Sequence, residues 1–251
     1  MNILKNVKSL FNLFVKTRFF YSLYFNFRYL PFDQAKRLPI RFYSKAYATI
    51  GKTAKITLTD NFIASKEKVH IGFAAKDFEY GCETTHLAIP FGEFIINGKF
   101  EARRGCQFDI RGKFTTGNDV LFGPRCRIRI HNNAEIGSEV RIAHETQVFD
   151  SNFHYTESVA QPGFISVSKP IFIGSRCWIG NRSTIGPGAY LPDYTTVTSS
   201  SLVNKNFSTL NPYSTIGGIP AKFIREGYTR VWDTKREVEY NKIEFNWYNK
   251  Q

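Results

Sequence analysis

The chain has 251 residues and a formal net charge of +13, with 34 Lys and Arg against 21 Asp and Glu. Its four cysteines lack the spacing of a metal site, so we expect free, buried thiols of a reducing compartment rather than a disulfide framework. The sequence contains no recognition-helix or single-strand-binding signature, and its basic charge therefore does not indicate a nucleic-acid partner.

The first 45 residues are strongly basic, with nine Lys or Arg and a single acid, Asp33. Apolar residues from Ile3 to Phe14 follow one helical face, and lysines lie opposite. No uncharged run reaches the ~18 residues of a transmembrane helix, and no signal-peptide cleavage site follows. Two interpretations of residues 1–30 stay open. The helix caps the end of the domain that follows, or it lies on the inner face of a membrane, with its lysines on anionic headgroups.

Residues 46–208 follow a period of six, which fits neither a helix nor a single strand. A large apolar residue recurs every six positions, and a small residue usually stands two positions before it. Such a unit fits a short strand followed by a tight corner, and three units form a triangular coil of about eighteen residues. The clearest inward-facing run is Ile173, Ile179, Ile185, Leu191, Val197 and Val203.

Stacking of these coils makes specific pairs of inward residues neighbours. Ile173 should lie beneath Leu191, Ile179 beneath Val197, and Ile185 beneath Val203. We therefore predict an all-β solenoid over residues 46–208. The predicted coils are interrupted at 63–93 and by a loop at 149–170, and the solenoid stands between a basic segment (1–45) and a C-terminal tail (209–251).

The second interruption reads "AHETQVFDSNFHYTESVAQPGFISVSKP" and carries Asp150, Asn152 and His154. Loops that leave a rigid scaffold are common places for catalytic groups. A histidine is the natural general base at neutral pH, and a carboxylate on its other ring nitrogen would fix its tautomer. By spacing alone, however, a histidine in a β-rich protein is more often a surface or hydrogen-bonding residue than a catalytic one.

Two stretches, "VFDSNFH" and "KPIFIGSRCWIGNRSTIGPGAYLPDYTTVTSSSLVNK…GGIPAKFIR", carry a resemblance that covers roughly residues 95–226. They are similar to the Asp-x-x-Phe-His loop, the Trp-Ile-Gly coil and the closing Pro-Ala-Lys of the hexapeptide-repeat acyltransferases. Within that superfamily the sequence most resembles bacterial capsule and O-antigen sugar O-acetyltransferases. The resemblance implies a left-handed parallel β-helix, with a short helical tail after it.

It also implies a homotrimer that binds acetyl-CoA between neighbouring solenoids and acetylates a saccharide hydroxyl directly, the acceptor being lipid-linked or nucleotide-linked. His154 would be the general base. We expect Asp150 to orient it and Asn152 to contact the acceptor, and we treat His144, the rival base, as an acceptor-site or structural residue. Ser199 and Ser200 stand where the family prefers Ala and Gly, which puts the shape of the coenzyme groove in doubt. The expected coenzyme contacts are Trp178, Asn181, Ser199, Asn204, Lys205, Lys222 and Arg225.

Two other functions remain open from the sequence: N-acetylation of an amino-sugar nucleotide, and a non-catalytic scaffold or sugar-binding role. A third, the β-helical carbonic anhydrase, needs a closely spaced histidine pair on one coil, and the five histidines provide none. We therefore expect no metal. The expected location is the cytoplasm, at the membrane surface if residues 1–30 bind it.

Overall fold

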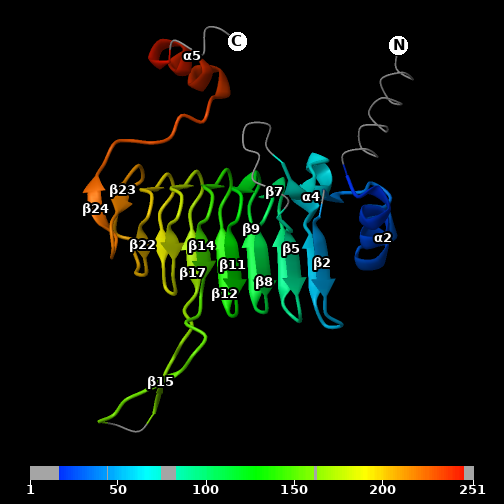
Figure 1. The fold of residues 1–251 in the computed structure, drawn as a ribbon, viewed down its shortest axis with the longest axis horizontal. Coiled ribbons are helices and arrows are strands. Elements are labelled where there is room, and N and C mark those ends of the chain that lie inside the picture. The colour runs from blue at the N-terminus through cyan, green and yellow to red at the C-terminus, as the bar shows by residue number, and fades with distance from the viewer. Residues whose placement is uncertain (1–16, 44, 75–82, 161–162, 246–251) are drawn as a thin grey trace.

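A computed structural model describes residues 17–43, 45–74, 83–160 and 163–245. The predicted all-β solenoid is confirmed: short parallel strands wind into three sheets that form the faces of a long prism (Figure 1). We call these sheets the first, second and third face, in the order in which each coil visits them.

The first face contains β1 (Ile40–Phe42), β4 (Val69–Phe73), β7 (Phe100–Arg103), β10 (Val120–Phe122), β13 (Arg141–Ile142), β18 (Trp178–Ile179), β21 (Thr196–Val197), β23 (Thr215–Gly217) and β24 (Lys222–Arg225). The second contains β2 (Tyr47–Ile50), β5 (His86–Ile89), β8 (Gln107–Ile110), β11 (Arg127–Ile130), β14 (Gln147–Phe149), β19 (Thr184–Ile185) and β22 (Leu202–Val203). The third contains β3 (Lys55–Leu58), β6 (Glu93–Ile96), β9 (Lys113–Thr116), β12 (Asn133–Ile136), β17 (Ile171–Ile173) and β20 (Tyr190–Leu191).

The six-residue period produces the core as predicted. Ile173 pairs with Leu191, and the other two predicted stacks, Ile179 on Val197 and Ile185 on Val203, are also present. All of these side chains are buried. Large aromatic side chains fill the prism toward its N-terminal half, where they contact one another; these are Phe94, Phe100, Phe108, Phe114 and Phe122.

The predicted free thiols are confirmed for Cys106, Cys126 and Cys177, which are buried at corner positions; Cys82 lies outside the described residues. Burial raises the pKa of Cys177 to about 12, so this thiol stays protonated and unreactive.

The predicted interruption at 63–93 is wrong in part, because β4 and β5 both lie inside it and continue the coil. The projection here is the short helix α4 (Asp60–Ser65), whose Phe62 packs into the core. The helix adds residues between strands, so the count of six fails even though the coil persists. The strands of the prism also extend beyond 46–208, from Ile40 to Arg225.

The N-terminal end of the prism is covered by α2 (Phe19–Tyr29), followed by α3 (Phe32–Ala35). Asn26 donates from Nδ2 to the Ile40 carbonyl oxygen at 2.7 Å and accepts from the Ile40 N–H at 3.1 Å. The Phe42 N–H donates to Ser22 Oγ at 3.0 Å. The helix thus satisfies the otherwise open edge of β1. The apolar face from Ile3 to Phe14 lies outside the described residues, so its membrane role stays a prediction.

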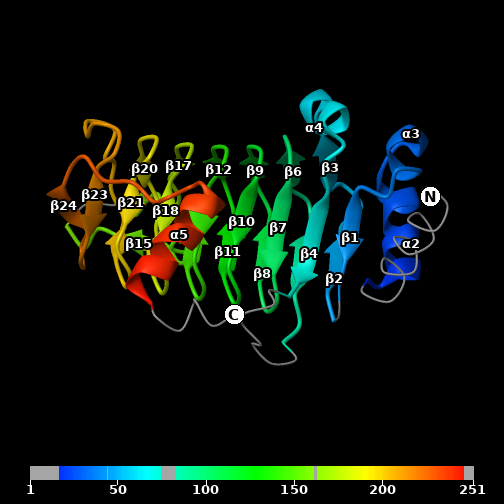
Figure 2. The same ribbon diagram turned by 90° about the horizontal axis from the view of Figure 1, so that it is seen from above.

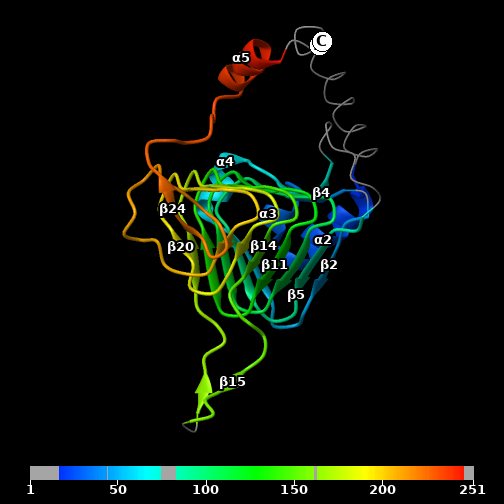
Figure 3. The same ribbon diagram turned by 60° about the vertical axis from the view of Figure 1, so that its left-hand side comes forward.

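Beyond β24, which pairs antiparallel with β23, the tail runs to α5 (Thr234–Glu244). This helix confirms the predicted helical tail. It stands off the solenoid on the side opposite to the loop that carries β15 (Thr156–Glu157) and β16 (Phe164–Ile165) (Figures 1 and 3). Seen from above, α5 overlies the first face (Figure 2). In the described part of the chain, no helix has the length and apolarity needed to span a membrane.

Candidate active site

The corners between the first and second faces form one long edge of the prism, which we call the first edge. Ile142 pairs with Ile179, and Ile179 pairs with Val197, so the residues two positions later stack in a column. That column contains His144, Asn181 and Ser199. Ser199 Oγ donates to Asn181 Oδ1 at 2.6 Å, and the Arg182 N–H donates to the His144 carbonyl oxygen at 3.1 Å.

A pocket of about 270 Å³ opens beside this column and brings His144 and Trp178 together. The Trp178 side chain is 40% exposed, in line with its predicted outward orientation. Arg103 and Arg141 line the pocket from the first face, and Arg230 lines it from the C-terminal tail. The aromatic and cationic lining suits a substrate with both an apolar and an anionic part.

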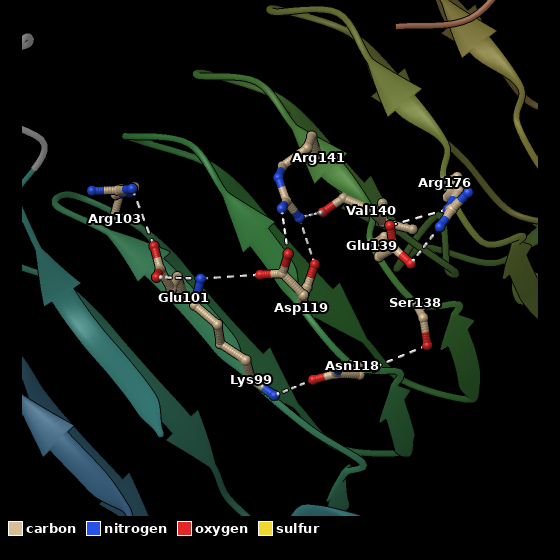
Figure 4. A network of polar contacts seen from close by, with 10 residues as sticks. All are labelled: Lys99, Glu101, Arg103, Asn118, Asp119, Ser138, Glu139, Val140, Arg141 and Arg176. Atoms are coloured by element: carbon tan, nitrogen blue, oxygen red, sulfur yellow. Dashed lines mark hydrogen bonds and ion pairs between the residues drawn. The ribbon is translucent and has the colours of Figure 1, made fainter. Parts of the chain in front are cut away.

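A network of charged side chains on the first face holds the pocket arginines in place (Figure 4). Lys99 Nζ lies 3.1 Å from both Glu101 and Asp119, and Arg103 pairs with Glu101 at 3.1 Å. Arg141 pairs with Asp119. Burial opposes ionisation of Asp119, but the hydrogen bond and charge of Arg141 outweigh it and lower the Asp119 pKa. Both guanidinium groups are therefore fixed before any substrate arrives.

The C-terminal tail crosses this pocket, which sequence reasoning missed. The guanidinium carbons of Arg141 and Arg230 each lie 5.6 Å from the Trp232 ring centroid, so the indole contacts both the first face and its own tail segment. Such cation–π contacts hold the tail over the first face. No periodic pattern in residues 226–233 indicates that they return to the solenoid.

The candidate base lies elsewhere, at the second edge, between the second and third faces. The chain leaves this edge after β14 and returns at β17. Asp150 is buried at the start of the loop, and its two carboxylate oxygens accept the backbone N–H groups of His131 at 2.8 Å and Asn132 at 2.7 Å. Desolvation raises the Asp150 pKa despite these bonds. Asp150 thus bonds to the backbone of the preceding coil, where a bond to the His154 imidazole was predicted. These bonds hold the start of the loop against the prism.

Phe153 anchors the part of the loop next to His154. Its ring lies 4.9 Å from the ring of His131 and 6.1 Å from that of Phe149, and the Arg129 guanidinium lies 5.5 Å from it. The backbone of Phe153 is left-handed (φ 65°), and this turn directs His154 and Asn152 outward, where both are exposed. The Phe of the Asp-x-x-Phe-His motif was the only sequence signal for this anchor.

The remaining predicted coenzyme contacts divide between the two edges. Asn204 and Lys205 are exposed just after β22, on the second edge with His154. Lys222 and Arg225 are exposed on β24, the last strand of the first face, on the side of Trp178. The intervening second face is one six-residue unit wide, at most about 20 Å. Within one chain, the predicted base thus shares its edge with Asn204 and Lys205, while the second face stands between it and the other predicted coenzyme contacts.

No family model matches the sequence. The WbbJ protein of Escherichia coli strain K12, whose name assigns it to O-acetyl transfer in lipopolysaccharide biosynthesis, is 25% identical over 158 residues, 58% of this chain and 76% of that protein. The chain is thus similar to a protein named as an acetyltransferase, and its fold is built from six-residue repeats. Within the described residues, no group of three or more His, Cys, Asp or Glu side chains gathers as metal ligands would.

Solved structures with similar shapes are also acyltransferases. The polysialic acid O-acetyltransferase OatWY is 16% identical, with a TM-score of 0.49 over 80% of this chain and 99% of that chain. The polySia-specific acetyltransferase NeuO is 17% identical, with a TM-score of 0.47 over 80% of this chain and 93% of that one. AntD, an N-acyltransferase from Bacillus cereus, is 14% identical, with a TM-score of 0.41 over 88% and 98%.

Proposed function

We propose that this protein transfers an acetyl group from acetyl-CoA to a sugar hydroxyl during the assembly of a cell-surface polysaccharide, in the cytoplasm. The observation that supports this most is the exposed His154, presented by an anchored loop on a hexapeptide-repeat solenoid related to WbbJ. Acetyl-CoA is polyanionic, and the exposed Lys205, Lys222 and Arg225 supply cations suited to its phosphates.

The active site is completed between two chains of a homotrimer. In each chain His154 and Lys205 lie on the second edge, whereas Trp178 and Asn181 lie on the first face and first edge. When the second edge of one chain meets the first face of its neighbour, the two groups face each other. Three such contacts close a ring with threefold symmetry. The exposure of His154, Lys205 and Trp178 supports the trimer, because these side chains are free to face a neighbouring chain.

His154 accepts the proton of the sugar hydroxyl while the oxygen attacks the thioester carbonyl. A backbone N–H of the adjoining coil stabilises the negative charge that develops on the carbonyl oxygen. The carbon–sulfur bond then breaks, and the imidazolium returns its proton to the leaving thiolate, so that free CoA and the sugar acetate are released. Asp150 acts as a positioning residue through the neck of the loop, while His144 and Asn152 contact the acceptor.

Complementation between two inactive chains tests this site directly. His154→Ala and Trp178→Ala would each lower the activity of a homotrimer. When the two are co-expressed, about a quarter of the contacts in randomly mixed trimers join an intact His154 to an intact Trp178. We expect activity to recover to about that fraction. A mixture as inactive as its parents, although mixed trimers form, would contradict a site shared between chains.

The acceptor class is tested by release of free thiol from acetyl-CoA. Hydroxyl-bearing saccharides should support the release, and an amino-sugar nucleotide should not. Faster release with the amine would overturn O-acetyl transfer in favour of N-acetyl transfer. A scaffold without enzymatic activity would show neither release nor thermal stabilisation by CoA.

A further inference from the structure

An apolar pocket lies at the N-terminal end of the prism, lined by none of the predicted site residues. Its volume is about 360 Å³, within the range of small-molecule sites, and it opens between α3, the end of β3 and α4. The apolar part of its lining consists of Pro39, Leu58, Phe62 and Ile63.

Cations surround this apolar floor. Arg37, Lys66 and Lys68 line the pocket, together with a single acid, Glu67. Arg37 Nη1 donates to the Ile63 carbonyl oxygen at 3.3 Å, and Lys68 Nζ donates to the Arg37 carbonyl oxygen at 2.8 Å. Backbone carbonyls thus hold two of the three cations in place at the mouth.

Among the residues that line the pocket, three cations face a single acid. Within the described ranges, no ion pair joins Arg37, Lys66 or Lys68 to a carboxylate. Burial, followed by repulsion from Arg41 and Arg37, lowers the pKa of Lys68. An anion in the pocket would relieve this repulsion and replace the hydration that Lys68 has lost.

We propose that this pocket binds an anionic amphiphile, an alkyl chain that carries a phosphate or carboxylate head. The chain would lie on Leu58, Phe62 and Ile63, and the head would meet Lys66 and Lys68. The protein's own residues 1–16 are a poorer occupant, because they carry three lysines and no acid and would add to the repulsion. The proposal does not depend on acetyl transfer.

Calorimetric titration of the full chain with decyl phosphate, below its micelle concentration, tests the site. We expect saturable binding of one molecule per chain. Inorganic phosphate and the uncharged decyl maltoside should each bind at least about tenfold more weakly. Phosphate lacks the alkyl chain, and decyl maltoside lacks the negative charge. Phosphate binding as tightly as decyl phosphate would overturn the apolar half of the proposal.

The variant K66Q/K68Q should weaken decyl phosphate binding at least about tenfold. Its matched control is K52Q/K113Q, which removes two exposed lysines outside the pocket. Because Lys68 also bonds to the Arg37 carbonyl, K66Q alone and I63D provide checks that leave that bond in place. The proposal would be overturned if K66Q/K68Q, K66Q and I63D all bound decyl phosphate as tightly as the control K52Q/K113Q. It would also be overturned if the unaltered protein did not bind decyl phosphate at millimolar concentration.

Sedimentation with anionic vesicles identifies the source of the amphiphile. If the K66Q/K68Q change and added decyl phosphate both reduce sedimentation, a bilayer lipid occupies the pocket. If decyl phosphate binds but vesicle sedimentation does not depend on Lys66 and Lys68, the ligand is a free or carrier-linked amphiphile. Either result supports the pocket as an amphiphile site.

Discussion

The first and second edges of the prism are made from the same six-residue unit, yet they present their histidines in different ways. On the first edge, His144 stands in a regular column below Asn181 and shares a pocket with Trp178. On the second edge, the chain leaves the prism and carries His154 outward on a loop anchored by Phe153. A regular corner fixes a side chain close to its own scaffold, whereas a loop carries an imidazole away from it, as the proposed contact with a neighbouring chain requires.

The largest expected effect separates these two histidines. His154→Ala should lower kcat at least about a hundredfold, because it removes the proton-transfer group, while His144→Ala should lower kcat less than about tenfold. The measurement is the steady-state release of thiol, with size-exclusion chromatography to check assembly. If His144→Ala is the more damaging change, the base belongs to the first edge and the comparison is reversed.

A smaller effect should follow from loosening the loop. Phe153→Ala removes the ring contacts to His131 and Phe149 and the packing of Arg129. We expect kcat to fall about tenfold, with the KM for acetyl-CoA nearly unchanged, because only the position of His154 is affected. The separate variant Phe153→Tyr keeps the ring, and its kcat should stay close to that of the unaltered protein. Equal loss in both variants would show that the ring contacts do not position the base.

The last expected effect concerns stability and not turnover, and it is measured at a histidine that belongs to neither edge. Burial lowers the pKa of His70 to about 4, and its Nδ1 lies 2.7 Å from the Tyr43 hydroxyl oxygen. Between this value and the unfolded value near 6.5, the unfolded chain binds the extra proton. Stability should therefore be complete above about pH 6.5 and fall by up to about 3 kcal/mol as the pH drops toward 4.

Urea unfolding at a series of pH values measures this loss, and His70→Gln should flatten the slope between pH 6.5 and 4.5 by removing the titrating group. An unchanged slope in that variant would assign the pH dependence to other residues. The measurement also sharpens the comparison of His154 with His144, since acid loss of activity can then be separated from acid unfolding.

The sequence predicted the C-terminal half of the prism well, because each six-residue unit needs one large apolar residue inside. Ile173 on Leu191 is a direct consequence of that need. The coil between α4 and β6 could not be predicted in the same way. Inserted residues break the six-residue spacing of the inward side chains there, although the strands themselves continue. The partners of Asp150 were also beyond sequence reasoning, because they are backbone groups of His131 and Asn132, one coil earlier.

The tail residues that reach the first-edge pocket posed a similar problem. Trp178 was correctly expected to point outward, from its place next to an inward residue. Trp232 lies in an irregular segment, where no periodicity relates a residue to a face. Its position depends on the contact with Arg141, a residue distant in the chain.

Asn26 and Ser22 occupy the hydrogen-bonding groups of β1 to which a further strand would otherwise add. At the far end, β24 runs antiparallel and breaks the parallel pattern. The edge of β1 is therefore closed to another strand, and a parallel coil cannot simply continue from β24. Both features work against growth of the winding by head-to-tail stacking of copies.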